Sequence, residues 1–478
     1  MPAPSQKHPL GGIEIAVLVH AGIFIAAGTW AFGGNAAFVR PWLSLWGTVG
    51  PFITIAAMLV NRKRTQVSLR PLAWLWPFGL FNALVLISCF FPLFRELRVG
   101  ERDFFATVAL PVWRPGAAVP ARALRALWLF DGIYLSCFNL ALIVRHRRGL
   151  RALLLAAAAN ALILSVFGTV QKLMGAKGIF FGLVKSPQIY FFSTFIYHNH
   201  WGAFIVLMAA VCLALVRHYA QWGEGRDLFH TPAFAGLVAV LFLAITVPLS
   251  TSRSCSLLLV LLLGGALVRW IAHKAGERRE FRESMTLPLL GAAAAIIVGL
   301  AGIWFIARDV ISMRVAKTEE QVAAMRARGS VGSRAVLYAD TWRMAKARLV
   351  FGWGMDSYPY VFQIYNSQDH PNKRDNLPNY YVDAHSDWLQ AVAEHGLVGA
   401  ALLALCGLAP LAALRRRRPW GTLPAHLLAG CALILLYAWV EFPFGNTAVV
   451  LCWWFCFFTA VSYARLGGRR TQETNPVS

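Results

Sequence analysis

Long apolar runs recur along this chain and are separated by short polar segments. A helix needs about 20 apolar residues to cross a bilayer, and we interpret twelve of the runs as such spans. The predicted spans are 12–32, 42–60, 71–92, 126–144, 152–172, 201–216, 232–249, 254–272, 286–307, 397–414, 423–441 and 446–464. The pattern predicts an all-α fold, a polytopic membrane bundle of about twelve helices.

Basic residues in the short connections predict the orientation of the bundle. They cluster after every second span, at 62–64, 145–148, 278–279, 415–418 and 469–470. Because such clusters stay in the cytoplasm, we expect both termini there. The first run is longer than a signal-peptide core and follows a single strong base, Lys7, so we expect it to remain as the first span.

Composition supports a membrane protein and excludes several other classes. The chain has 478 residues, of which 58% are hydrophobic and 14% charged. Its net charge of +23 is spread along the spans without a nucleic-acid-reading motif, so no nucleic-acid partner is expected. The 8 cysteines lie in or beside apolar spans, with no CxxC or HExxH pattern. We therefore predict no disulfide framework, no bound metal and no cofactor.

Three longer segments interrupt the bundle on the side opposite the basic clusters. Segment 93–125 is rich in Arg and Pro, 173–200 is aromatic as at a membrane interface, and 308–396 is the longest connection. The first and third carry many arginines. They either translocate as idle loops or form a surface for an anionic lipid or diphosphate.

A helical pattern lies within the longest of these segments. Its apolar face is predicted to hold Tyr338, Trp342, Ala345 and Leu349, and its basic face Arg343, Lys346 and Arg348. Gly352 and Gly354 would end it. This pattern is typical of an amphipathic helix lying on the bundle or the membrane, and a solvated helix that merely packs fits it equally well.

A titratable residue precedes the tenth predicted span. The segment 385–399 has the pattern H-[S/N]-x9-G-x-x-G. Asp383 and Ser386 are candidate N-caps and Gly396 is placed to end the helix, so His385 is expected in its first turn. The helix dipole disfavours imidazolium there, and a neutral imidazole can act as a base. The alternative is a histidine without a role in catalysis.

A second candidate lies in the turn between the seventh and eighth spans. Arg253 stands there among hydroxyl side chains, Thr251, Ser252 and Ser254. A guanidinium stays charged and can hold two phosphate oxygens at once, although an arginine at a span end can also simply snorkel. Two crossings separate this turn from His385, and two separate it from Asn199. The three residues are therefore expected on one side of the membrane.

From Gln171 onward the chain resembles the O-antigen ligase and polymerase family. The resemblance rests on motifs in order: 197–203 opening a span, the T-S-R-S turn at 251–254, Ser333-Arg334 with Trp342 and 352–354, 385–389 with Glu394 and Gly396, and Glu441-Phe442-Pro443. Ser386 replaces the commoner Asn, and Ser333 the Gly before Arg334. The earlier spans resemble the family only in hydropathy.

The resemblance implies a metal-independent, inverting glycosyltransferase of the bacterial inner membrane with a periplasmic active site. Its donor would be an undecaprenyl-diphosphate-linked glycan, and its acceptor a hydroxyl of a glycan, lipid A-core or another molecule. His385 would be catalytic. Residues implied in substrate binding are Arg253, Arg334, Asn199, Ser386, Asp387, Lys172 and Lys185. Membrane lipids would surround the bundle.

Two other functions remain open at this point. Glu14, Asp131 and Glu441 lie within predicted spans, and acids at such positions can mark the pathway of a transporter or lipid flippase. A protein O-oligosaccharyltransferase would use the same site with a different acceptor. The ligase and the polymerase are not distinguished.

We divide the chain into N-terminal spans (1–172), central spans (173–307), a periplasmic catalytic loop (308–396) and C-terminal spans with a cytoplasmic tail (397–478).

Overall fold

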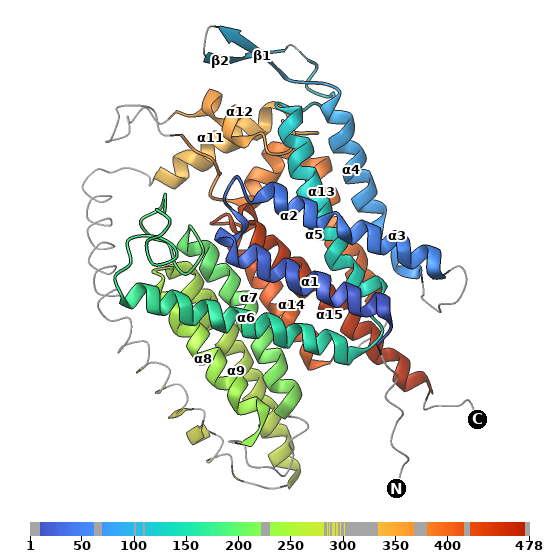
Figure 1. The fold of residues 1–478 in the computed structure, drawn as a ribbon, viewed down its shortest axis with the longest axis vertical. Coiled ribbons are helices and arrows are strands. Elements are labelled where there is room, and N and C mark those ends of the chain that lie inside the picture. The colour runs from blue at the N-terminus through green and yellow to red at the C-terminus, as the bar shows by residue number, and fades with distance from the viewer. Residues whose placement is uncertain are drawn as a thin grey trace.

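A computed structural model gives the fold of the chain. It describes residues 10–61, 69–99, 102–108, 110–220, 230–281, 333–367, 380–414 and 421–473, with single positions between 284 and 301. Within these residues the molecule is a bundle of helices with one small β-hairpin (Figure 1). The all-α membrane architecture predicted from the sequence is confirmed.

The elements follow one another in the order that the apolar runs predict. The helices are α1 (Gly12–Trp30), α2 (Arg40–Gly47), α3 (Val49–Asn61), α4 (Trp76–Cys89), α5 (Pro120–Leu142), α6 (Arg147–Leu173), α7 (His198–Ala220), α8 (Pro232–Leu249), α9 (Arg253–Phe281), α11 (Ser333–Ala347), α12 (Tyr358–Tyr365), α13 (Asp387–Leu414), α14 (Thr422–Tyr437) and α15 (Thr447–Glu473). Short 3-10 turns are η1 (Phe32–Gly34), η2 (Arg70–Leu75) and η5 (Pro443–Gly445).

Nine helical stretches in the described residues are long and apolar enough to cross a membrane. They coincide with nine of the predicted spans. The span 126–144 corresponds to α5, which also carries charged side chains, and 423–441 corresponds to α14, a shorter apolar helix. The predicted span 286–307 lies almost entirely outside the described residues.

The centre of the bundle is formed by α15 and α7. Almost every residue of α15 between Thr447 and Ala464 is buried, and α7 is buried along most of its length. The other long helices surround these two and expose many apolar side chains. A helix that is apolar on all sides suits the middle of a membrane bundle, and one with an exposed apolar face suits contact with lipid.

The Arg-rich segment 93–125 contains a β-hairpin that the sequence analysis did not predict. Strands β1 (Phe94–Val99) and β2 (Arg102–Thr107) pair antiparallel, with Phe94 opposite Thr107. The hairpin lies at one end of the molecule beside α11 and α12, far from the end of α15 (Figure 1). The strands are short and lie outside the long apolar runs, so a pattern of membrane spans gives no signal for them.

The predicted helix of segment 308–396 is α11, and its buried face matches the predicted one only in part. Ala345 is buried as predicted, together with Leu337, Thr341 and Met344, whereas Trp342 is 44% exposed. Arg348, expected on the basic face, is also buried. Its Nη2 donates to the carbonyl oxygens of Pro111 and Arg114, so backbone oxygens rather than a carboxylate accept from the guanidinium.

Helix α13 is interrupted at Gly396, where φ is 63° and ψ is −174°. This confirms that the helical conformation stops at Gly396, although a helix resumes directly after it. The amides of Leu397 and Val398 donate to the carbonyls of Leu349 and Val350 instead of to their own helix. The carbonyls released at positions 393 and 394 accept from the amides of residues 353 and 354.

The loop 349–354 is therefore inserted into the hydrogen-bond ladder of α13. The approach is close: a Cβ on Gly396 would lie 2.3 Å from the Val350 oxygen, and one on Gly352 would lie 2.3 Å from the Glu394 oxygen. Only glycine fits at either position. This interlock fixes α11, which precedes the loop, against the start of α13, and it thereby fixes the segment that carries His385.

Candidate active site

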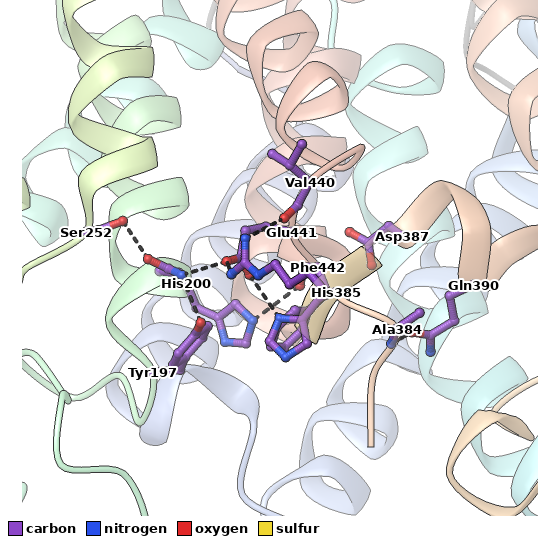
Figure 2. Close-up of polar contacts among 12 residues, drawn as sticks. Tyr197, His200, Ser252, Ala384, His385, Asp387, Gln390, Val440, Glu441 and Phe442 are labelled. Atoms are coloured by element: carbon purple, nitrogen blue, oxygen red, sulfur yellow. Dashed lines mark hydrogen bonds and ion pairs between the residues drawn. The ribbon is translucent and has the colours of Figure 1, made fainter. Parts of the chain in front are cut away.

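Five segments meet at the end of the bundle where the hairpin and α11 lie. They are the start of α7, the turn before α9, the first turn of α11, the segment before α13 and the connection between α14 and η5 (Figure 2). Each segment ends or begins a helix, so polar side chains at these positions leave the apolar bundle together. Motifs that are far apart in the sequence therefore lie together in one cluster.

Glu441 is the centre of this cluster. It lies just after α14, is 2% exposed, and its Oε1 accepts hydrogen bonds from Arg334 Nη2 and, at 3.1 Å, from Asn199 Nδ2. Burial alone would raise the pKa of this carboxyl, but His385 and Arg334 outweigh burial and hold the pKa below its usual value. Glu441 is therefore a carboxylate at neutral pH.

Asn199 joins the carboxylate to the turn before α9. Its Nδ2 also donates to the Tyr197 hydroxyl at 2.8 Å, and its Oδ1 accepts from Ser252 Oγ at 2.7 Å. The amide of a single asparagine thus uses both its donors and its acceptor. Three segments that are far apart in the chain are held together by this one side chain.

Arg334 brings the positive charge to the cluster. It is the second residue of α11; its Nη1 donates to the Val440 carbonyl at 3.3 Å, and its Nη2 pairs with Glu441. Burial tends to lower its pKa, but Glu441 more than compensates, so the pKa is raised and the guanidinium stays charged. Its side chain is 50% exposed. One face of the guanidinium is thus open to an anionic ligand.

His385 lies directly beside the buried carboxylate. Its Nδ1 is 3.5 Å from Glu441 Oε2, and neither atom has a hydrogen-bond partner among the described residues. A carboxylate opposite Nδ1 favours a proton on that nitrogen and leaves the lone pair on Nε2. The ring is 29% exposed and stands perpendicular to the Phe442 ring, with centroids 4.7 Å apart. The imidazole is therefore both oriented and accessible.

The backbone at His385 differs from the expected first helical turn. The residue lies two positions before α13 with φ of 53°, in the left-handed region that is uncommon for residues with a side chain. The Tyr338 hydroxyl donates to its carbonyl oxygen at 2.9 Å and helps to hold this conformation. Helix propensity is overridden here by contacts with α11. Strained residues of this kind cluster at active sites.

Ser386 and Asp387 have positioning contacts in the structure. Ser386 is buried, and its Oγ accepts from the Leu389 amide at 3.4 Å, as an N-cap of α13. Asp387 Oδ2 accepts from the Phe444 amide at 2.8 Å, and its own amide donates to the Glu441 carbonyl at 3.2 Å. These bonds fasten the His385 segment to the Glu441 segment.

The three remaining predicted residues are exposed. Arg253 is exposed at the start of α9, next to Ser252, which is bound to Asn199. Lys172 and Lys185 are exposed in the last turn of α6 and the segment after it. None of the three is a partner of Glu441.

Several residues of the cluster were not among the predicted site residues. The sequence predicts Glu441 as an acid in a span and as part of a motif, and Tyr338 as part of a helical face, without a role for either at the site. His200 lies at the end of the aromatic segment 173–200, which gives it no separate signal. Its Nε2 lies 3.2 Å from the Phe442 carbonyl, and its ring is perpendicular to that of Phe442. The signal for Glu441 was its position in the Glu-Phe-Pro motif.

Comparison with known protein families identifies the part of the chain that carries this site. Residues 237–404 match the family model described as O-antigen ligase. Residues 237–404 are an O-antigen ligase domain. Arg253, Arg334 and His385 lie inside the domain, and Asn199 and Glu441 lie outside it but contact it. No curated protein matches the chain.

The O-antigen ligase domain sets the coarse function of the protein. The chain is a multi-pass membrane protein that carries an O-antigen ligase domain, and this domain supports a membrane glycosyltransferase activity of the O-antigen ligase type. The part of the domain described by the structure supplies a cation and an imidazole. The buried carboxylate that orients them comes from the helix pair that follows the domain.

Proposed function

We propose that the protein transfers a glycan from undecaprenyl diphosphate to an acceptor hydroxyl at the periplasmic face of the inner membrane. The observation that carries the proposal is the Glu441 network, which places an oriented imidazole beside a half-exposed guanidinium at one end of the bundle. Glycosyl transfer from a diphosphate requires these two functions: a proton acceptor for the hydroxyl and a cation for the departing phosphate.

In the proposed reaction His385 Nε2 takes the proton of the acceptor hydroxyl. The acceptor oxygen forms a bond to the anomeric carbon while the bond from that carbon to the diphosphate oxygen breaks. Because the two events occur on opposite faces of the sugar, the transfer inverts the anomeric configuration. Glu441 stabilises the imidazolium that forms, as a carboxylate does in other dyads.

The diphosphate gains negative charge as it leaves, and we propose that the arginines stabilise this charge. Arg334 presents an open face beside the network, and Arg253 directly follows Ser252, which donates to Asn199. Fixed cations in a water-poor site stabilise such charge strongly. We assign to the exposed Lys172 and Lys185 the attraction of the anionic lipid rather than contact with the reacting phosphate.

The alternative of a transporter or flippase loses its main support in the structure. Glu14 Oε1 accepts from the amides of Arg145 and His146, so the carboxylate caps the start of α6. Asp131 accepts from Asn82 Nδ2 at 3.0 Å. Glu14 also pairs with His146 Nδ1 at 2.8 Å, so both acids have local structural partners, whereas Glu441 lies in the cluster that holds Arg334 and His385.

Orientation in the membrane is also part of the proposal. Figure 1 places the beginning of α1 and the end of α15 on one side, and the hairpin, α11 and α12 on the other. The positive-inside rule assigns the first side to the cytoplasm and therefore the Glu441 network to the periplasm. Labelling of engineered single cysteines from outside the cell would check this: one at Arg95 should react, and one at Thr422 should not.

An in-vitro assay tests the function directly. Purified protein in nanodiscs is mixed with donor and acceptor lipids extracted from cells in which the gene has been deleted, where both accumulate. The expected product contains a new glycosidic bond, and undecaprenyl diphosphate is released. Identifying the acceptor in that product distinguishes ligase, polymerase and protein transferase. Movement of the donor across the membrane without bond formation would favour the flippase.

Chelation should leave the activity unchanged. The arginines can carry the charge compensation, and within the described residues no group of three or more His, Cys, Asp or Glu side chains is placed to hold an ion. We expect turnover with excess EDTA to equal turnover without it. Loss of activity that is restored by one particular divalent ion would refute metal independence.

The substitution Arg253→Lys should lower donor affinity and turnover much more than Arg95→Lys. Lysine keeps the charge at position 253 but lacks the planar fork that binds two phosphate oxygens, and we expect a loss of about ten-fold or more. Arg95 is an exposed residue of β1 and serves as the matched control. Both variants are measured in the same nanodiscs after their folding is checked. Equal, mild effects would show that Arg253 only snorkels.

A further inference from the structure

A second polar surface adjoins the His385 segment and takes no part in the Glu441 network. It begins at Arg122, in the first turn of α5, whose Nε lies 3.3 Å from Asp356 Oδ2. The guanidinium also lies over the Tyr360 ring, 5.1 Å from its centroid. Both members of the ion pair are partly exposed, at 39% and 33% of their side chains. The pair is therefore accessible to a ligand.

The backbone that presents Asp356 is held rigidly. Its φ is 57°, again in the left-handed region, and its amide donates to Glu394 Oε2 at 3.1 Å. The Trp353 carbonyl accepts from the Ala118 amide at 2.7 Å, which fastens this loop to the start of α5. A strained, well-anchored residue with a partly exposed carboxylate is more typical of a functional site than of a solvated loop.

Asp383 connects this surface to His385. It stands two residues before the histidine, and a Cβ on Gly445 would lie 3.3 Å from its Oδ1. Burial raises the pKa of Asp383 to about 6, while His385 and Arg40 act in the opposite direction. Burial also raises the pKa of Asp356, against Arg122 and Arg40. Hydrogen bonds join the two segments: Glu394, which accepts from the Asp356 amide, also accepts from Gln390 Nε2 at 3.3 Å, and Gln390 Oε1 accepts from the Ala384 amide at 3.0 Å.

The composition of the surface indicates the kind of ligand. Two carboxylates and two guanidiniums balance in charge, so a diphosphate would gain little there and would meet Asp356 and Asp383 as like charges. Tyr380, which is 59% exposed, directly precedes Tyr381, whose ring packs edge-on against Phe362 of α12, the helix that also carries Tyr360. Ion pairs that offer donors and acceptors beside tyrosine rings suit a neutral molecule rich in hydroxyls, with apolar ring faces.

We propose that the acceptor glycan binds along the Arg122–Asp356 pair, with Tyr360 and Tyr380 against its sugar rings, and passes Asp383 to present its hydroxyl to His385. This assignment rests on the proposed glycosyl transfer and adds the location of its second substrate. Donor and acceptor then approach His385 from two differently charged surfaces: the diphosphate beside Arg334 and Arg253, and the neutral glycan beside Arg122.

Kinetics with the second substrate tests the assignment. Arg122→Gln, Asp356→Asn and Tyr380→Ala are assayed in nanodiscs with the donor and acceptor lipids extracted from the deletion strain. We expect each variant to raise the acceptor KM by about ten-fold, the effect of a lost charge-assisted contact, while the affinity for radiolabelled donor stays within about two-fold of the wild type. Asparagine accepts the left-handed backbone, so Asp356→Asn preserves the loop.

Two further variants separate binding from folding. Arg343 pairs with Asp340 on α11 and is similarly exposed, at 52%, so Arg343→Gln is the matched control and should leave the acceptor KM unchanged. Tyr380→Phe keeps the ring and should retain most of the affinity that Tyr380→Ala loses. A merely structural role would lower donor affinity and thermal stability in parallel with the KM effect.

The outcomes distinguish this inference from the proposed function. If the wild type transfers glycan but Arg122→Gln and Tyr380→Ala keep the normal acceptor KM, the acceptor binds elsewhere and the inference is wrong. If donor affinity falls together with acceptor affinity, the surface is structural and the inference is also wrong. If the wild type forms no new glycosidic bond with these substrates, it is the proposed transfer that fails.

Discussion

Replacing His385 with alanine should lower turnover by about 10²-fold or more while the protein still folds and inserts, because a lost general base costs at least that much. The ring is partly exposed and its side-chain nitrogens make no hydrogen bond shorter than the 3.5 Å approach to Glu441. Its removal therefore leaves little of the fold unsupported. Turnover of the purified variant in nanodiscs, compared at equal protein, measures the effect.

The partner of His385 provides the control for this experiment. Glu441→Gln keeps the shape of the side chain and can still pair with Asn199, but it removes the charge that orients and stabilises the imidazole. If Glu441 acts through His385, the double variant should be little worse than His385→Ala alone, because residues that act as a unit are not additive. Near-normal activity of His385→Ala would exclude it from the mechanism.

Much of the fold follows from hydropathy alone. A run of apolar residues in a bilayer generally forms a helix, because every backbone polar group must then find its hydrogen-bond partner within the segment. The nine confirmed spans are predicted for that reason. The hairpin β1–β2 and the buried face of α11 are not, since both depend on contacts with distant segments. Arg348 illustrates this: carbonyls more than 200 residues earlier in the chain allow a guanidinium to be buried.

The site was predicted in part, and for a different reason. His385, Arg334 and Asn199 were found through motifs, and the structure brings all three to Glu441. Glu441 was not included among the predicted site residues, because hydropathy placed it inside a membrane span. Its partner Asn199 is 242 residues away, and no local pattern encodes that distance. Electrostatic pairing across helices has to be read from the structure.

The interlock at Gly396 shows how the site depends on backbone geometry. Two amides and two carbonyls of α13 exchange their helical partners for the loop 349–354. Each of these four groups keeps a hydrogen-bond partner in the exchange, which matters next to an apolar bundle. The sequence indicates that a glycine ends the helix, but it does not indicate that another loop enters the break.

Substituting Gly396 with alanine should therefore destabilise the protein and abolish activity together. The conformation at φ 63° and ψ −174° is accessible almost only to glycine, and other residues pay roughly 1–3 kcal/mol for backbone strain of this kind. The added Cβ would also lie 2.3 Å from the Val350 oxygen, so the loop has to withdraw and its hydrogen bonds to α13 are lost. Thermal unfolding of the purified variant, followed alongside turnover, measures both effects.

Gly79 supplies the matched control for this substitution. It lies in α4, where a Cβ would meet nothing within 4 Å, and alanine has the higher helix propensity. Gly79→Ala should keep the unfolding temperature and the turnover of the wild type, or raise the former slightly. If Gly396→Ala behaves like Gly79→Ala, loop 349–354 does not depend on the break in α13, and the rigid placement of His385 would have to come from Tyr338 and Asp387 alone.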